Sequence, residues 1–261
     1  MQIKNNLRQL FFYLLGVGFI FFLWWIGHEL LPKNIPSITD VVHLLFNESK
    51  TEDGINRNLV RVLSTAEYAL WGLLWSCVIS FIVVVIVGLI PDFDSFIKPL
   101  AIFIKATPAV ALVPIFMIFF PKSEAQQYIA TAAAISFFPL YIEGINGIKI
   151  VPDKLVKLAE VYHTSRWKQF WYFKSGYVFE RMIGALQVSA PLSMVGAIIG
   201  APLIGGNEYS LGIFIFSNTG ASDSVARFVA IALAFFAGMV FYLSGLLIHR
   251  LYAKYIRIEK A

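Results

Sequence analysis

Long apolar segments alternate with shorter polar segments along the chain. Six of the apolar segments hold the roughly 20 residues that an α-helix needs to cross the ~30 Å hydrocarbon layer of a bilayer. They span residues 10–31, 66–90, 99–120, 127–148, 178–200 and 226–249. The pattern predicts an all-α polytopic membrane protein, in which about six transmembrane helices form a single domain over residues 1–261.

Prolines interrupt two of these segments without excluding a helix. Pro108 and Pro114 lie in the third segment, and Pro139 lies in the fourth. Packed membrane helices tolerate proline because neighbouring groups satisfy the freed backbone groups. The first segment follows Lys4 and Arg8, as in a signal peptide, but it is longer than a typical signal-peptide core and no small-residue cleavage site follows it. We therefore expect it to be retained as the first membrane helix.

Two connections carry patterns of their own. Residues 37–47 place apolar side chains at i, i+3, i+4 and i+7 behind a capping box of Ser37 and Asp40. This predicts an external amphipathic helix that lies along the membrane surface. Residues 201–225 contain a Gly-Gly-Asn turn and an apolar stretch at 211–216 that is too short to span. The stretch is either a re-entrant hairpin or a packed loop, and we favour the packed loop.

Composition agrees with a membrane location. Hydrophobic residues make up 58% of the chain and charged residues only 14%, whereas a soluble domain carries about 25% charged residues. The net charge of +5 does not indicate nucleic-acid binding, because the basic residues lie between apolar runs and form no continuous groove. The single cysteine, Cys77, excludes an intrachain disulfide, and the histidines are scattered, so no metal site is expected. No cluster of acids, histidines or nucleophiles indicates an enzyme.

The distribution of lysine and arginine predicts the orientation of the chain. With the N-terminus inside, the cytoplasmic segments hold 15 of the 21 basic residues and the external segments hold 6. The positive-inside rule therefore places both termini in the cytoplasm. It also places the longest helical connection, residues 150–176, on the cytoplasmic side.

Residues 150–176 predict two short amphipathic helices joined by a polar turn. A Pro-Asp pair at 152–153 provides a helix start, and apolar residues follow at helical spacing. After a break at 163–165, aromatic and basic residues at 167–174 form a second stripe that we expect to face water. Such a pair is either an interfacial anchor or a docking element for a soluble partner, and the pattern alone supports both equally.

Two charged residues lie inside predicted spans, where charge is costly and often functional. Lys105 is predicted one turn into the third span, and Glu143 near the inner end of the fourth. Because the two are expected at similar depth, we predict an ion pair between them. Lys105 alternatively reaches the cytoplasmic interface or meets an anion in the membrane.

The fifth span is rich in small and polar residues. Gln187, Ala190 and Met194 share one face at i, i+3 and i+7. That face either packs closely against another helix or lines a translocation pathway together with Thr107 and Pro108. In a pathway, hydroxyl, amide and backbone groups can hold an anion without a full counter-charge.

Several short motifs, in their order and spacing, resemble one family. Residues 106–116 are similar to a Pro-x-x-Ala-Leu-x-Pro-Leu-Phe stretch, and residues 151–170 are similar to a cytoplasmic "EAA" loop, most closely at the Ser-Arg-Trp of 165–167. Smaller matches lie at residues 35–37, 61–64 and 137–139. From Ile35 onward, the chain resembles the permease subunit of bacterial ATP-binding-cassette (ABC) importers of the nitrate/sulfonate/taurine type.

The loop departs from the family's pattern and is a degenerate EAA motif. The Glu-Ala-Ala falls on the Lys-Leu-Ala of residues 157–159, so only Ala159 is retained. The usual glycine falls on His163, the later proline on Gly176, and the glycine that commonly ends the third span on Pro121. These differences indicate the same docking element with altered contacts.

The resemblance implies the fold of an ABC type I importer permease and a set of partner subunits. A second permease subunit, identical or paralogous, completes a central pathway for a small anionic or organic solute. An extracytoplasmic substrate-binding protein delivers the solute, and ATPase subunits bind the cytoplasmic loop. The residues implied in ATPase coupling are Lys157, Leu158, Ala159, Glu160, His163, Thr164, Ser165, Arg166, Trp167 and Phe170.

No cofactor is expected on this chain. The sequence has no Walker-type phosphate loop, so ATP and Mg²⁺ are expected on the partner ATPase. The resemblance therefore implies a transport subunit, not an enzyme, in the bacterial cytoplasmic (inner) membrane. Two alternatives stay open. One is a secondary transporter, which a visible inverted repeat would favour; the other is a scaffold subunit of another membrane complex.

Overall fold

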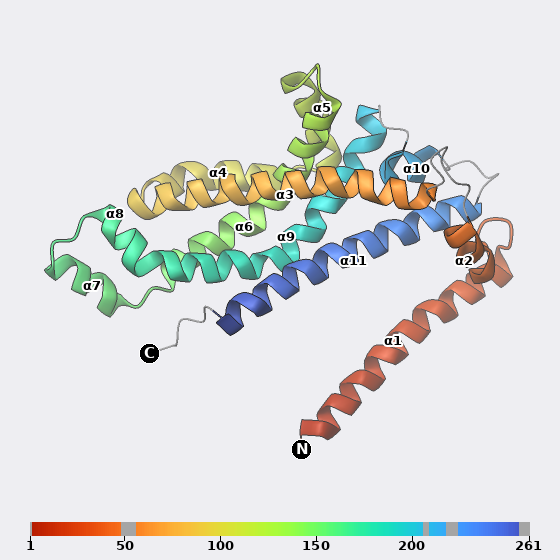
Figure 1. Ribbon diagram of the computed structural model, residues 1–261, viewed down its shortest axis with the longest axis horizontal. Helices are drawn as coiled ribbons and strands as arrows, with labels where there is room; N and C mark the ends of the chain where they lie inside the picture. Colours follow the sequence, from red (N-terminus) through yellow and green to blue (C-terminus); the bar gives the residue numbers. More distant parts are fainter. Residues whose placement is uncertain (1, 48–55, 206–208, 218–223, 256–261) are drawn as a thin grey trace.

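The computed structural model of the protein describes residues 2–47, 56–205, 209–217 and 224–255, and its regular elements are helices (Figure 1). In chain order they are α1 (Gln2–Leu30), α2 (Ile38–Asn47), α3 (Arg57–Leu89), α4 (Phe93–Ala106), α5 (Ala109–Phe119), α6 (Glu124–Lys149), α7 (Asp153–Val161), α8 (Arg166–Gln169), a π-helical turn (Phe170–Lys174), α9 (Ser175–Ile204), α10 (Leu211–Ser217) and α11 (Ser224–Tyr255). The predicted all-α fold is confirmed.

Four of the described helices are long and apolar enough to cross a membrane. They are α3, α6, the continuous helix Arg166–Ile204 that contains α9, and α11. These helices run side by side as an elongated bundle (Figure 1). They coincide with the predicted second, fourth, fifth and sixth spans, so the polytopic membrane class expected from hydropathy is confirmed.

The predicted third span, residues 99–120, is not one continuous helix. α4 begins earlier, at Phe93, and α5 leaves it at an angle of 113°. Pro108 causes the break, because a proline lacks an N–H and disfavours helical backbone at the preceding residue. Thr107 accordingly has extended backbone, with φ −74° and ψ 129°. α5 therefore turns out of the direction that α3 and α4 share (Figure 1).

α6 and α9 form the centre of the bundle, where small residues let their backbones approach. A Cβ atom on Gly196 would lie 2.7 Å from the Cα of Ala132, and one on Gly147 would lie 2.6 Å from the Cα of Val178. In lipid, close packing of this kind is a main source of helix association. The pair therefore provides a rigid frame for the segments at both of its ends.

α1 diverges from the bundle and covers the predicted first span (Figure 1). Its apolar side chains are exposed, Leu14 and Ile20 each to 64%, as expected for a helix surrounded by lipid. It is attached near its C-terminal end. There the indole N–H of Trp24 donates to the carbonyl of Pro36 at 3.0 Å, and the Trp24 ring centroid lies 5.3 Å from that of Phe228 in α11.

The external amphipathic segment predicted at residues 37–47 forms α2. Its helix starts at Ile38 because the hydroxyl of Ser37 accepts a hydrogen bond from the amide of Asp40 at 3.1 Å. Val41, on the apolar face, is buried against α11. The predicted cap thus starts the helix, and the predicted apolar face attaches it to α11.

The segment after α9 packs against the bundle. α9 continues to Ile204 and ends at Gly205, which has a positive φ of 78°. Leu211, at the start of α10, is fully buried, and its amide donates to the hydroxyl of Thr65 in α3 at 2.9 Å. In its described part this segment therefore packs against the bundle as a helix and not as the expected loop. The Gly-Asn part of the predicted turn lies in residues 206–208, outside the described residues.

Candidate functional site

The predicted docking connection folds into α7, a tight reversal and α8. At the reversal, the amide and the hydroxyl of Thr164 both donate to the carbonyl of Ala159, at 3.1 and 2.9 Å. The hydroxyl of Ser165 caps α8 by accepting from the amide of Lys168 at 3.5 Å. His163 has a φ of 46°, in the left-handed region that glycine adopts at least cost. This geometry gives a physical reason for the glycine at that place in the loop it resembles.

The expectation of a second, separate short helix in this connection is wrong. α8, the π-helical turn and α9 form one helix of 39 residues, Arg166–Ile204. The expectation that its aromatic stripe faces water is also wrong for Phe170, which is 0% exposed. The Phe170 ring fills the space beside Gly88 at the end of α3, where a methyl group would overlap it. Gly88 lies far away in sequence, so helical periodicity could not reveal this contact.

Two cations attach the same helix to the C-terminal end of α3. A guanidinium N–H of Arg166 donates to the carbonyl of Leu89 at 3.2 Å, and the ammonium of Lys174 donates to that of Gly88 at 3.4 Å. The last carbonyls of a helix have no intrahelical partner and form the negative end of its dipole. The connection between α6 and α9 is therefore attached directly to the end of α3 as well as to α9.

α7 presents an exposed apolar surface beyond the membrane helices. Leu158, Val161 and Tyr162 are 45%, 74% and 73% exposed and lie at i, i+3 and i+4. Ala159, on another face of the helix, is buried, and its carbonyl accepts the two hydrogen bonds from Thr164. Exposed apolar clusters of this kind mark interaction sites. Val161 and Tyr162 were not among the predicted coupling residues. Their helical spacing of three and four residues from Leu158 could have indicated that all three share one apolar face.

The predicted coupling residues divide by exposure. Ala159 and Phe170 are buried, Thr164 is half-buried, and the side chain of Glu160 lies outside what the structure describes. The exposed members are Lys157, Leu158, His163, Ser165, Arg166 and Trp167.

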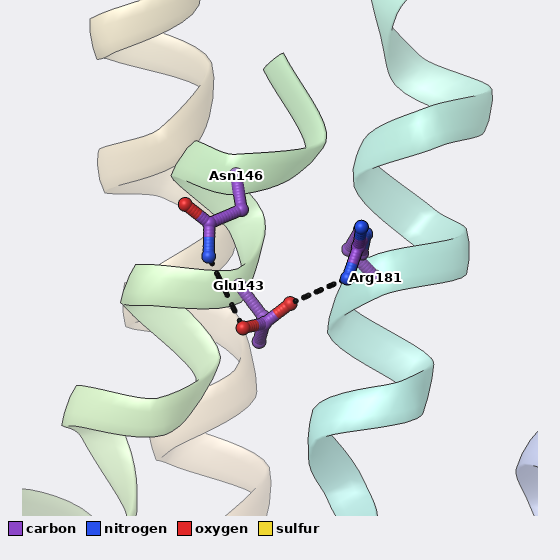
Figure 2. A network of polar contacts seen from close by, with 3 residues as sticks. All are labelled: Glu143, Asn146 and Arg181. Atoms are coloured by element: carbon purple, nitrogen blue, oxygen red, sulfur yellow. Dashed lines mark hydrogen bonds and ion pairs between the residues drawn. The ribbon is translucent and has the colours of Figure 1, made fainter. Parts of the chain in front are cut away.

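The predicted ion pair between Lys105 and Glu143 is wrong. Glu143 instead pairs with Arg181 of α9 at 3.3 Å and accepts a second hydrogen bond from the Asn146 amide at 3.1 Å (Figure 2). Because α4 begins at Phe93, Lys105 lies in its last turn and not near its start. Its ammonium instead lies 4.6 Å from the centroid of the Phe138 ring.

A polar cavity of about 630 Å³ lies between α6, α9 and α11. It contains the Glu143–Arg181 ion pair and a hydrogen bond of 2.8 Å between the Gln187 amide and a ring nitrogen of His249. Gln187 therefore faces a cavity, as one of the two predicted alternatives requires. Ala190 and Met194, further along the same helix, are 1% exposed and lie in the core, because the helices close together above the cavity.

A second cavity, of about 450 Å³, lies at the bend between α4 and α5. Lys105, Thr107 and Pro108 line it on one side, with residues of α6 and α9 such as Phe138 and Leu192 on the other. The predicted pathway residues are thus divided within this chain. Thr107 and Pro108 belong to the bend cavity, Gln187 to the polar cavity and the remaining two to the core.

The fold and these sites define a class: a helical, polytopic membrane protein with cavities among its spans and a protruding segment outside them. No protein-family model matches the sequence. The chain is 28% identical over 144 residues to the riboflavin transport system permease protein RibX of Chloroflexus aurantiacus, covering 55% of this chain and 53% of that protein. It is 26% identical over 118 residues to the formylaminopyrimidine transport permease protein ThiX of Halalkalibacterium halodurans, covering 45% and 46%.

These similarities extend over part of each protein. The chain spans about half the length of the curated relatives it matches. Both are named as permeases of transport systems, and neither is named for nitrate, sulfonate or taurine. The likeness therefore favours a membrane transport subunit more strongly than it favours any one solute.

Proposed function

We propose that this chain is the permease subunit of an ABC importer, a transport protein with no catalytic chemistry of its own. It lies in the bacterial cytoplasmic membrane with both termini in the cytoplasm. The likeness to two transport permeases supports this proposal, as do the bundle of long apolar helices and the excess of basic residues on the side assigned to the cytoplasm.

The observation that carries the proposal is the exposed apolar surface of α7 on a rigid mount. Leu158, Val161 and Tyr162 face outward, while Arg166 and Phe170 attach the adjoining helix to the end of α3. A partner that binds α7 can therefore move α3 and α9 as rigid bodies. Packed interfaces convert such movements into discrete states, because they are not continuously deformable.

In the proposed mechanism, separate subunits bind the solute, hydrolyse ATP and form the transmembrane pathway. ATPase subunits hold ATP and Mg²⁺ and bind α7, and their closure drives two permease subunits from an inward-facing to an outward-facing state. A substrate-binding protein delivers solute on the external side. The second permease subunit is an identical copy or a paralogue. No cofactor is assigned to this chain.

The proposed solute is a small organic molecule with a nitrogen heterocycle. The names of the relatives support this class, since riboflavin and formylaminopyrimidine both contain such rings. The nitrate/sulfonate/taurine group that the motifs resemble provides the competing solutes. Uptake of riboflavin, pyrimidines, taurine and nitrate by vesicles containing the complete complex decides between the two groups.

Co-purification with ABC ATPase subunits expressed in the same host tests the function. We expect the full chain to retain the ATPase, and Leu158→Glu combined with Val161→Glu to lose it, because two charges enter an apolar contact. Phe46→Glu provides the control, since Phe46 is also an exposed apolar residue, 72% exposed, but lies on α2. An ATPase complex that survives the α7 substitutions contradicts the assigned docking surface. Uptake driven by an ion gradient without any ATPase would favour a secondary transporter, and neither activity would favour a scaffold.

A further inference from the structure

Two cations meet at the end of α3 without an anionic partner. Arg166 and Lys174 donate to the carbonyls of Leu89 and Gly88, which are neighbours in the last turn of that helix. These carbonyls carry only a partial negative charge. Within the part of the chain that the structure describes, no carboxylate forms an ion pair with either cation. A guanidinium has five N–H donors and an ammonium has three, so both side chains retain donors for an anion.

Aromatic side chains accompany the two cations, as they do at a membrane–water interface. Trp171 and Tyr172 lie between Arg166 and Lys174 in the sequence, and both are exposed. Tryptophan and tyrosine are enriched at the level of the lipid headgroups. α8 lies beside the end of α3 (Figure 1), on the side that the basic residues assign to the cytoplasm. Anionic lipids of that leaflet attract lysine and arginine next to a membrane helix.

An apolar cavity of about 170 Å³ lies between α3 and α9, further into the membrane than the cations. Phe81 of α3 lines it together with Phe179, Ile183 and Leu186 of α9. Phe179 and Leu186 follow Lys174 by five and twelve residues, which is about 8 and 18 Å along a helix. The cavity therefore covers the depth of about one leaflet, since the whole hydrocarbon layer is ~30 Å thick.

Aromatic rings connect the interface to this cavity. The ring centroid of Phe81 lies 6.2 Å from that of Trp171 and 5.1 Å from that of Phe179. Phe179 is 39% exposed, so the cavity opens on the outer surface of the bundle. An apolar cavity of about 150 Å³ stays dry and holds a molecule the size of benzene, so this cavity suits a segment of an acyl chain. A helix of a second subunit, about 10 Å across, is too wide to enter it.

We propose that the junction of α3 and α9 binds one anionic phospholipid. The lipid phosphate accepts hydrogen bonds from Arg166 and Lys174, and one acyl chain passes Trp171 and enters the cavity between Phe81 and Phe179. The bound lipid thereby supplies the negative charge that the described carboxylates do not. This inference goes beyond the transport function proposed above and does not depend on it.

Lipid binding to the purified full-length protein in detergent tests the site. Native mass spectrometry counts the bound molecules while three probes are titrated separately. They are phosphatidylglycerol, which is anionic, phosphatidylcholine with the same acyl chains, which is zwitterionic, and glycerol 3-phosphate, which has no acyl chain. We expect one phosphatidylglycerol to bind about tenfold more tightly than phosphatidylcholine, because two cations face the phosphate. Glycerol 3-phosphate should not bind measurably.

Substitutions of the cations test the headgroup contact. Lys174→Gln and Arg166→Gln should each weaken phosphatidylglycerol binding about fivefold, the effect expected of one basic residue beside an anionic lipid. Lys154→Gln is the matched control, because it removes an exposed cation of α7 outside the site, and it should leave binding unchanged. Lys174→Arg keeps the charge and should keep the binding, so the test holds even if Lys174→Gln fails to fold.

A substitution in the cavity tests the acyl-chain contact. Ile183→Phe fills the cavity and should weaken the binding of both phospholipids. Ile82→Phe is the matched control, since Ile82 is exposed on α3 and does not line the cavity, and it should weaken neither. The melting temperature of each variant without added lipid identifies the variants that are folded.

Two sets of results would overturn the proposal. Equal binding of the two phospholipids, or phosphatidylglycerol binding that both glutamine variants retain in full, excludes the headgroup contact. Folded Lys174→Arg that has lost phosphatidylglycerol leads to the same conclusion. Binding that survives Ile183→Phe, or glycerol 3-phosphate that binds as tightly as phosphatidylglycerol, excludes the acyl-chain contact.

Discussion

The ring of Phe170 lies against the backbone of Gly88, so that the start of one membrane helix packs directly on the end of another. Phe170 is 0% exposed at a position where the sequence alone predicts an aromatic group facing water. Arg166 and Lys174 reinforce the contact by donating to the last carbonyls of α3. This junction connects the proposed docking segment to the membrane bundle.

Gly88→Ala should disrupt the junction. The new methyl group overlaps the Phe170 ring, and overpacking of a buried site costs about 1–3 kcal/mol. We expect a lower unfolding temperature in detergent and weaker stimulation of the partner ATPase. Gly16→Ala is the control, since nothing lies within 4 Å of a Cβ there. Adding Phe170→Leu to Gly88→Ala should recover part of the loss; strictly additive effects would show that the two residues do not interact.

The ion pair predicts that the charges of Glu143 and Arg181 contribute jointly to stability. Both side chains are partly exposed, 33% and 46%, so a double-mutant cycle with Glu143→Gln and Arg181→Gln should give a coupling energy of about 0.2–1 kcal/mol. The equivalent cycle with Lys105→Gln in place of Arg181→Gln should give none. Unfolding in denaturant measures both, and the opposite ranking would favour the Lys105 pair predicted from sequence.

Gln187→Ala should lower transport without preventing assembly. It removes the hydrogen bond that connects α9 to His249 of α11 inside the polar cavity, and a bond of this type contributes about 0.5–1.5 kcal/mol. We therefore expect an uptake rate two- to tenfold lower, as an order of magnitude, in reconstituted vesicles. Val188 lines the same cavity but does not make that hydrogen bond, so Val188→Ala should lower uptake less. Equal uptake by wild type and Gln187→Ala would remove any essential role for the amide.

His163→Gly should stabilise the reversal after α7. His163 is exposed and has a positive φ, which costs a side-chain-bearing residue about 1–2 kcal/mol, whereas the added freedom of glycine in the unfolded chain costs about 0.5–1 kcal/mol. The net gain is therefore between about 0 and about 1.5 kcal/mol. His163→Val should destabilise, since β-branched residues tolerate this conformation poorly. Unfolding temperatures in the opposite order would contradict the assigned backbone geometry.

Most of the fold could be predicted because membrane helices obey a local rule. A segment of about 20 apolar residues satisfies its own backbone and suits the bilayer wherever its neighbours lie, so α3, α6, α9 and α11 are visible in hydropathy. The capping box at Ser37 is equally local, and it was predicted with the helix it starts. The sequence shows that Pro108 interrupts the third apolar segment but does not predict the 113° bend, because the effect of a proline on a helix depends on the groups around it.

The candidate sites required the tertiary structure, because each depends on contacts between distant segments. Hydropathy and periodicity along the chain are enough to predict the membrane class, the helical segments and a patterned connection between α6 and α9. The tertiary structure was needed to show that Phe170 is buried against Gly88, that Glu143 pairs with Arg181, and that Lys105 lies beside the bend between α4 and α5. The physical reason is that hydrophobicity and periodicity are properties of one segment, whereas a cavity, an ion pair or a buried ring requires two segments whose relative depth and rotation are set by packing.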